Sequence, residues 1–167
     1  MTNQDVALKY YGDSSLSANV LANKVNTESE LELKVAAESA FLMIEIMESQ
    51  RGVGLAANQI GLSIPVFVWS YKDHNGVAIN PEIVKISDDY VDDISEGCLS
   101  SPGVEVKMSR RVSLTMKANA VDGTEFELDA SGYLARIIQH EIDYLSGKCI
   151  VDSLNRESRR KIAKAYR

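Results

Sequence analysis

The sequence predicts an α+β fold in which antiparallel sheets pack around a central helix, with another helix towards each end of the chain. The order of its segments favours this class, because a helical pattern comes first, β-rich runs fill the middle and an apolar helix follows them. The length of 167 residues favours one domain, spanning residues 1–167, with one sizeable core.

The N-terminal part predicts an arm followed by a helix. Residues 1–26 are polar and irregular, with a turn expected at 10–12, so we expect an extended arm lying on the body. Thr27 is a candidate N-cap, with Glu30 three residues later as in a capping box. Apolar residues recur at helical spacing over 31–47, and the helix should end before the glycine-rich segment that begins at Gly52.

The middle of the chain predicts strands. Residues 64–71 are rich in β-forming residues, 73–76 (DHNG) signal a turn, and 77–86 read as a return strand interrupted by Pro81. Further strands are expected at 103–108, 111–117 and 124–128, with a turn at 122–123 between the last two.

Two more helices follow. Residues 131–148 predict a helix with a broad apolar face, which Ser131 can cap and Gly147 can end. Residues 154–166 predict a short C-terminal helix that carries most of a basic run. This run is interpreted either as a solvated helix end or as a contact with ribosomal RNA.

Composition and charge exclude several classes. The net charge of −6 argues against a broad electrostatic grip on nucleic acid or an anionic membrane, and no apolar run approaches the ~20 residues of a membrane helix. Two cysteines are too few for a disulfide scaffold and suit a reducing compartment. The N-terminus has no signal or transit pattern, so we expect a cytoplasmic protein.

The most informative motif is His140-Glu141 on the apolar helix. In HExxH, two histidines four residues apart share one metal ion and the glutamate acts on a bound water; here the last position is Tyr144. Taken alone, a His-Glu dipeptide on a helix is more often a surface histidine paired with a nearby acid than a metal site. The apolar surroundings of His140 favour a buried imidazole that needs a partner.

Two other segments could join this site. Cys98 lies beside a glycine in SEGCLS, and a thiolate is a strong soft metal ligand, although an ordinary buried cysteine fits equally well. The small residues around Gln59 in GVGLAANQIG would permit close approach of a peptide, or simply a tightly packed turn. Cys149 has no such setting and is expected in the core.

Together, three strings in order resemble the motifs of the peptide deformylase family: GVGLAANQ (52–59), EGCLS (96–100) and QHEIDYLSG (139–147). The likeness extends from about residue 30 to residue 150. It implies a metal-dependent hydrolase that removes the N-formyl group from the formylmethionine of newly made proteins. The implied cofactor is one divalent ion, with iron as the native metal and zinc, nickel or cobalt as substitutes.

The resemblance also assigns roles by position. Cys98 and His140 match metal ligands, and Tyr144 holds the place of the third. Glu141 matches the general acid/base, while Gln59 and the main-chain N–H of Leu99 match the donors that stabilise the oxyanion. The positions implied at the substrate are Val53, Gly54, Ile94, Glu96, Gly97 and Ile137, and Glu96 is expected to orient the metal site with a basic partner such as Arg110.

Tyr144 leaves several outcomes open. A phenolate could ligate the ion, the ion could be held by Cys98, His140 and waters, or metal binding could be lost; His74, in the expected turn, could replace the ligand. A homologue impaired in metal binding that holds formyl-methionyl peptides without efficient turnover is one alternative. A metal-free hydrolase using Cys98 with His140 as base is another.

The expected partners follow from the resemblance and the basic tail. They are N-formylmethionyl nascent peptides and, through the C-terminal helix, the ribosome. We expect a monomer with no membrane partner and no specific nucleic-acid sequence.

Overall fold

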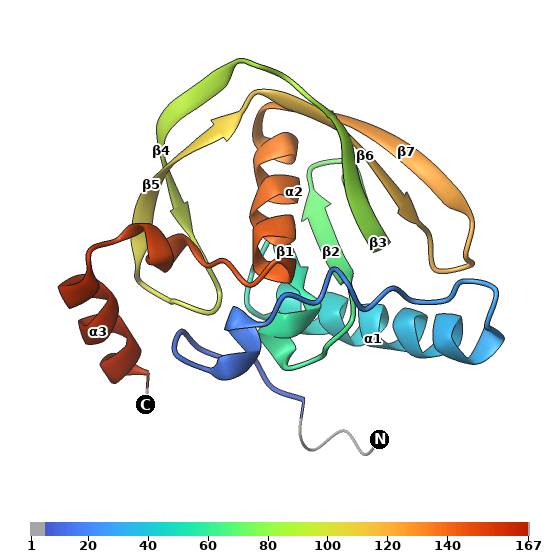
Figure 1. Cartoon of the computed structure of the whole chain (residues 1–167), viewed down its shortest axis with the longest axis horizontal. Coiled ribbons are helices and arrows are strands. Elements are labelled where there is room, and N and C mark those ends of the chain that lie inside the picture. The colour runs from blue at the N-terminus through green and yellow to red at the C-terminus, as the bar shows by residue number, and fades with distance from the viewer. Residues whose placement is uncertain (1–5, 167) are drawn as a thin grey trace.

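The computed structural model describes residues 6–166 and has the predicted α+β architecture (Figure 1). Its helices are α1 (Glu30–Ser49), α2 (Gly132–Leu145) and α3 (Arg156–Ala165), with short 3-10 turns η1 (Ser14–Ser17), η2 (Ala57–Ile60) and η3 (Ile150–Ser153). Its strands are β1 (Gly54–Ala56), β2 (Val66–Tyr71), β3 (His74–Ile86), β4 (Tyr90–Gly97), β5 (Glu105–Arg111), β6 (Ser113–Asn119) and β7 (Glu125–Ser131).

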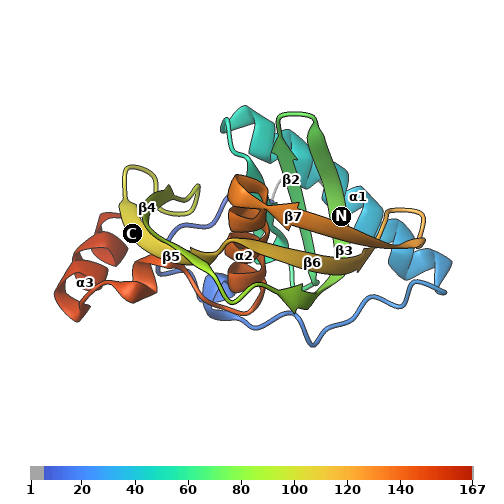
Figure 2. The same ribbon diagram turned by 90° about the horizontal axis from the view of Figure 1, so that it is seen from above.

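The strands form two antiparallel sheets around α2. The larger sheet has the order β1-β2-β3-β6-β7, and β4 pairs with β5 in a separate ribbon beside α2 (Figure 2). Residues of β2 alternate between two core clusters: Val66 and Val68 pack with α1, whereas Phe67 and Trp69 pack with α2. Period-2 alternation therefore lets one buried strand join both halves of the core.

The described part of the N-terminal arm lies along the body, as predicted; residues 1–5 of the arm are outside the described range. Main-chain hydrogen bonds join Lys9 N to Gln59 O (2.7 Å) and Tyr11 N to Ser100 O (2.8 Å). The expected turn at 10–12 is present, with Gly12 at φ +105°. The arm therefore supports two segments that carry predicted site residues.

The predicted N-cap of the first helix was wrong by two residues. Ser29, not Thr27, caps α1, and its hydroxyl accepts from Glu32 N. Glu32 Oε2 accepts from Asn26 N at 2.8 Å. This bond holds residues 26–29 in a turn before the helix, so the helix begins after Ser29 rather than after Thr27. The helix ends at Ser49, before Gly52, as predicted.

The predicted turn at 73–76 was also displaced. The hairpin turns at Lys72 and Asp73, and His74 already pairs with Tyr71 at the start of β3. Gly76 pairs with Trp69 within the strand, and a Cβ atom at this position would lie 2.6 Å from the Trp69 ring. This glycine serves the packing of a tryptophan rather than a turn.

The remaining strands largely follow the predictions. The register of β3 against β6 shifts between Ile79 and Glu82, around Pro81, and the strands predicted at 103–108, 111–117 and 124–128 are β5, β6 and β7 within a few residues. The turn before β7 contains Gly123 at φ +84°. Strands β1 and β4 were not predicted, and both carry site residues.

Helix α2 runs through the centre of the fold (Figure 1). Ser131 occupies its N-cap position without a side-chain capping bond, and Gly147, at φ +81°, donates its N–H to Tyr144 O just past the C-terminus. The predicted C-terminal helix is α3. Within residues 6–166, no helix is both long enough and apolar enough to cross a membrane.

Candidate active site

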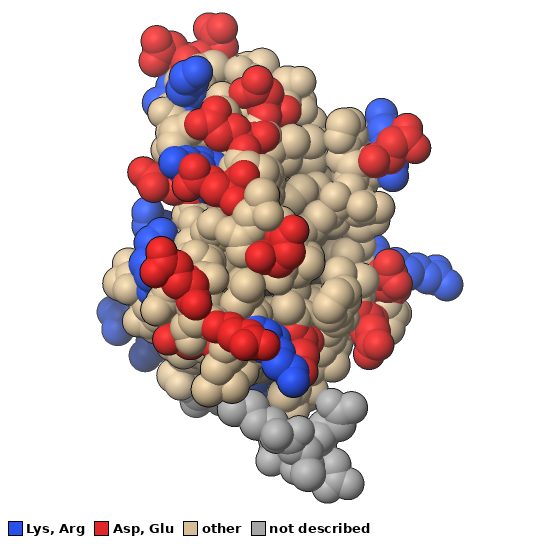
Figure 3. All heavy atoms as spheres, turned by 90° about the vertical axis from the view of Figure 1, so that its right-hand side faces the viewer, with Lys and Arg blue, Asp and Glu red and all other residues tan. Residues whose placement is uncertain are grey.

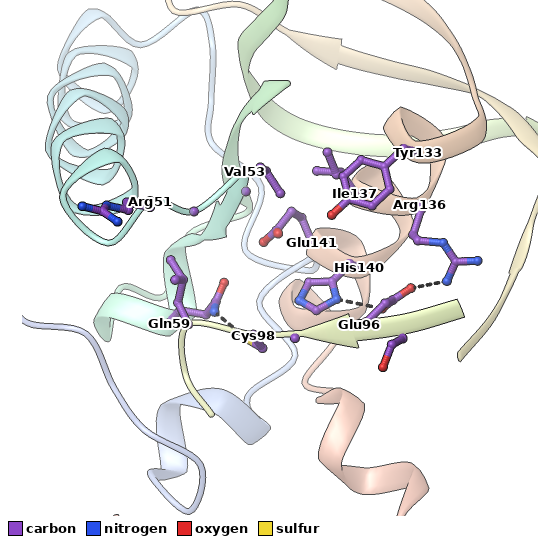
Figure 4. Close-up of a pocket in the computed structure, with 15 residues that line it drawn as sticks. Arg51, Val53, Gln59, Glu96, Cys98, Tyr133, Arg136, Ile137, His140 and Glu141 are labelled. Carbon is purple, nitrogen blue, oxygen red and sulfur yellow. Dashed lines mark hydrogen bonds and ion pairs between the residues drawn. The ribbon is translucent and has the colours of Figure 1, made fainter. Parts of the chain in front are cut away.

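A cavity of about 370 Å³ opens between β1, β4 and α2, and all three predicted motif segments line it (Figure 4). Gly54 and Gln59 come from β1 and η2, Gly97 and Cys98 from the end of β4, and His140 from α2. These residues are distant in sequence, so the fold, not chain proximity, brings the segments together.

Gln59 is held so that its amide nitrogen faces Cys98. Its Oε1 accepts from Ala56 N at 2.8 Å, and its Nε2 lies 3.4 Å from Cys98 Sγ and 3.1 Å from Ser100 Oγ (Figure 4). The side chain is buried, which makes this orientation stable. Among the described residues, none accepts a hydrogen bond from Leu99 N–H. Two N–H groups thus lie beside the cavity as candidate oxyanion donors.

Glu96 is the centre of a buried ion network. Arg110 donates to both its oxygens, at 3.0 and 2.9 Å, Arg136 Nη1 lies 2.6 Å from Oε1, and His140 Nδ1 lies 3.0 Å from Oε2. Burial alone would raise the pKa of Glu96, but hydrogen bonds from His140 and Arg110 outweigh burial and lower the pKa to about 2. Glu96 is therefore ionised and only accepts hydrogen bonds.

The same network fixes His140. Because Glu96 accepts at Nδ1, that ring nitrogen carries a proton and the other nitrogen is directed towards Cys98. Burial opposes a charged imidazole, but hydrogen bonds with Cys98 and Glu96 raise the pKa of His140 to about 10. Arg110 also donates to Asp143, one helical turn later on α2.

Glu141 lies against the cavity with one oxygen beside Gly54. Burial raises the pKa of its carboxyl group to about 7. Its Oε2 is shielded from solvent and has no hydrogen-bond partner among residues 6–166. A carboxyl group that exchanges protons near neutral pH suits general acid–base chemistry.

Tyr144 is almost completely buried and does not line the cavity. Its ring lies 5.2 Å from the His140 ring between centroids, and its hydroxyl lies near the thiols of Cys98 and Cys149 without hydrogen-bond geometry to either. Burial raises the pKa of Tyr144 well above its usual value, and the neighbouring Cys98 and Cys149 raise it further. Burial of Tyr144 thus favours the neutral phenol.

Of the other predicted positions, some line the cavity and others do not. Val53, Gly54, Gly97 and Ile137 line the cavity, whereas Ile94 is exposed on β4 outside its lining, so its contact with substrate stays a prediction. His74 lies exposed at the start of β3 and is not among the residues that line the cavity. Sequence reasoning missed Arg136 and Tyr133, which line the cavity from α2. A basic residue four positions before His140 on an apolar helix face was the available signal for Arg136.

Comparison with known proteins decides the family. Residues 8–160 match the family model described as polypeptide deformylase. The chain belongs to the peptide deformylase family. Peptide deformylase of Dictyoglomus thermophilum is 44% identical over 133 residues, which cover 80% of this chain and 85% of that protein. Peptide deformylase of Buchnera aphidicola is 35% identical over 160 residues, which cover 94% of this chain and 88% of that protein.

Solved peptide deformylases share the whole fold. The Ehrlichia chaffeensis structure has a TM-score of 0.82 at 27% identity, over 96% of this chain and 94% of that one. The Synechococcus elongatus structure, a complex with actinonin, has a TM-score of 0.80 at 32% identity, over 99% and 88% of the two chains. The chain is accordingly a member of an amide hydrolase family whose members generally depend on a metal.

Cys98 and His140 are donor types that suit a divalent ion, but they are one protein ligand fewer than such a catalytic site usually has. Catalytic zinc sites commonly use three protein ligands and one open position. Cys98 and His140 supply a thiol and an imidazole on the same side of the cavity, whereas no three His, Cys, Asp or Glu side chains in residues 6–166 are arranged to hold a metal. Glu141 Oε2 and the Tyr144 hydroxyl are buried near these two residues and have no hydrogen-bond partner among residues 6–166.

Proposed function

We propose that this single-domain protein hydrolyses the formamide bond of N-formylmethionyl peptides, releasing formate. The observation that carries the proposal is the meeting of Gln59, Cys98, His140 and Glu141 around one cavity. They supply a donor for an oxyanion, two metal ligands and a general base, the groups that amide hydrolysis requires.

The metal would be held by Cys98 and His140, with solvent completing its coordination. When bound, it would supply Lewis-acid activation of the attacking water near neutral pH. Iron is the proposed native ion, and zinc, nickel or cobalt are proposed substitutes. The neutral phenol of Tyr144 would stay behind the two ligands, since burial opposes phenolate formation.

The chain's own residues account for the proton transfers. Glu141 would take a proton from the attacking water and deliver it to the departing amine nitrogen, and its raised pKa suits both transfers. The amide of Gln59 and the N–H of Leu99 would donate to the oxygen of the former carbonyl, where negative charge develops. Losing one such donor commonly costs about 3 kcal/mol of transition-state stabilisation.

The shape of the site would select the substrate. Val53 and Ile137 provide an apolar surface for the methionine side chain, and Gly54 and Gly97 leave the main chain open for a peptide. Ile94 lies on the adjoining strand, where it could contact a longer peptide but not the cavity floor. A formyl group is small, so a close fit would exclude acetylated chains.

The charge of helix α3 suggests a docking surface close to the source of the substrate. It carries five basic residues and lies at the end of the molecule opposite α1 (Figure 1). Acidic and basic side chains are mixed over the surface seen from the α1 end (Figure 3), whereas α3 carries five basic residues and one acidic residue in a chain of net charge −6. We propose that a cytoplasmic monomer docks on the ribosome through α3, where nascent formylated chains emerge.

Formate release from formyl-Met-Ala-Ser tests the proposed reaction, with acetyl-Met-Ala-Ser as the matched substrate. The wild-type protein, purified without air, should release formate and leave the acetyl peptide intact. Glu141→Gln should be slower by about a hundredfold or more, because the base is lost while the shape is kept. Equal rates for Glu141→Gln and wild type, or no formate from the wild type with added Fe²⁺ or Zn²⁺, would contradict the proposal.

A further inference from the structure

Arg136 lines the cavity from α2 and binds three residues of the two strands β4 and β5. It lies on α2, four residues before His140, and its side chain is 5% exposed. Nη1 donates to Glu96 Oε1 at 2.6 Å and to Met108 O at 3.1 Å, and Nη2 donates to Val91 O at 3.3 Å. One guanidinium group thus joins α2 to both β4 and β5.

The carboxylate of Glu96 is held by a complementary set of bonds. Oε1 accepts from Arg136 and from Arg110 Nε, while Oε2 accepts from His140 Nδ1 and from Arg110 Nη2. Each oxygen therefore accepts two hydrogen bonds, which uses its lone pairs fully. Arg136 and His140, one helical turn apart on α2, bind different oxygens of this one carboxylate (Figure 4).

We propose that Arg136 is a positioning residue for His140, acting through Glu96. Arg110 approaches Glu96 from β5 and also binds Asp143 on α2. Arg136 instead reaches the carboxylate from α2 itself, one helical turn before His140. By fixing Oε1, it fixes the Nδ1–H bond to Oε2 and thereby the direction of Nε2 towards Cys98. This inference rests on the proposed function only in taking His140 as a metal ligand.

A purely structural role is the rival. Arg136 would then only tie β4 and β5 to α2 through the carbonyl groups of Val91 and Met108, and its loss would lower stability without altering the His140 ring. The two roles differ in the behaviour of one proton, the one on His140 Nδ1.

The chain has only two histidines, so imidazole NMR can observe that proton directly. In metal-free wild-type protein, His140 should give a protected Nδ1–H signal, and exposed His74 should not. Arg136→Met should weaken or remove the His140 signal and leave the His74 signals unchanged. In a Co²⁺ titration followed by the absorption of the Cys98 thiolate complex, the same variant should lose about tenfold to a hundredfold in metal affinity.

Leu134→Ala is the matched control, since Leu134 is buried on the same helix and lies outside the network. It should lower Tm through a cavity while leaving the Nδ1–H signal and the Co²⁺ affinity as in wild type. Arg136→Lys keeps the charge but cannot reach Glu96, Met108 and Val91 together, and should show intermediate values of both readouts. It decides the question if Arg136→Met does not fold.

An unchanged Nδ1–H signal and Co²⁺ affinity in the folded Arg136 variants would overturn the positioning role. Neither readout needs turnover. A wild-type protein that released no formate would therefore contradict the proposed function while leaving this comparison intact.

Discussion

Gly54 and Glu141 lie so close that a Cβ atom at position 54 would be 2.3 Å from Glu141 Oε1. The same Cβ would lie 2.9 Å from the carboxyl carbon of that glutamate. The glycine of the first motif therefore makes room for the acid of the third. This contact explains why the fold requires the absence of a side chain at Gly54, separately from any contact with substrate.

Gly54→Ala should displace the Glu141 carboxyl group and slow formate release by about a hundredfold or more, the usual loss for a general base. Overpacking of this kind should also lower stability by about 1–3 kcal/mol. Steady-state kinetics and thermal unfolding measure the two effects. Gly97→Ala is the control for stability, because its Cβ would come no nearer than 3.9 Å to Val104 O and Tm should stay unchanged. Wild-type kcat in Gly54→Ala would contradict the expected displacement of a catalytic Glu141 carboxyl group.

Tyr144→Phe separates the two ways in which a metal could be held. If the phenol remains neutral behind Cys98 and His140, removal of its hydroxyl should leave Zn²⁺ affinity unchanged. The metal-free protein should keep or gain stability, because an unpartnered buried hydroxyl carries a desolvation penalty of about 1–3 kcal/mol. Competition with a chromophoric chelator measures the affinity, and a large loss would instead identify Tyr144 as a ligand.

Tyr144→His is the complementary change. Histidine at this position would place a second imidazole four residues after His140 on the same helical face. Metal affinity should rise by about tenfold or more, because the ion gains a third protein ligand. The same chelator competition measures this, and affinity equal to wild type would mean that the surrounding core does not let the new imidazole reach the ion.

The two cysteines should differ sharply in reactivity. Cys149 is buried, and burial raises the pKa of its thiol to about 12, whereas Cys98 lies at the cavity. For a thiol whose pKa lies above 7, each further unit of increase in that pKa lowers the thiolate fraction about tenfold at neutral pH. In metal-free protein, iodoacetamide should therefore modify Cys98 well before Cys149, and bound Zn²⁺ should protect Cys98. Mass spectrometry of digested protein identifies the site, with Cys98→Ser as control; equal labelling of both thiols would contradict the burial of Cys149.

Ribosome docking through α3 can be tested by charge removal. Arg156, Arg160 and Lys164 are exposed and spaced by one helical turn, so their replacement by alanine should weaken co-sedimentation with ribosomes and reduce its salt dependence. Replacing Lys24, Lys34 and Lys85, three exposed lysines elsewhere, removes the same charge and should have little effect. Equal losses for both triple variants would mean that only net charge matters.

The site residues found from sequence lie in short contiguous strings, each with its own chemical signature. His140-Glu141 on an apolar helix, Cys98 beside a glycine and Gln59 among small residues could be recognised without knowing the fold. Arg136 could not be assigned in the same way. Its partner Glu96 is 40 residues away in the chain, and only the pairing of β4 with β5 brings that carboxylate to α2.

The secondary structure likewise depends partly on local sequence and partly on contacts between residues that the local pattern does not show. The helices follow from apolar spacing, but the choice of Ser29 over Thr27 as cap depends on the bond between Asn26 and Glu32. Strand β4 has no regular alternation and is bent at Asp93, where φ is +56°, so its pattern does not predict a strand. It forms because β5 supplies the partner backbone.

The most direct measurement is bound metal beside formate release in protein purified without air or chelator. Elemental analysis should find near one equivalent of a divalent metal, and a chelator should stop formate release from formyl-Met-Ala-Ser. Formate release that persists without metal would point to Cys98 as a nucleophile with His140 as base. Neither metal nor formate, even after Fe²⁺ is added, would contradict a metal-dependent deformylase with Tyr144 at the third ligand position.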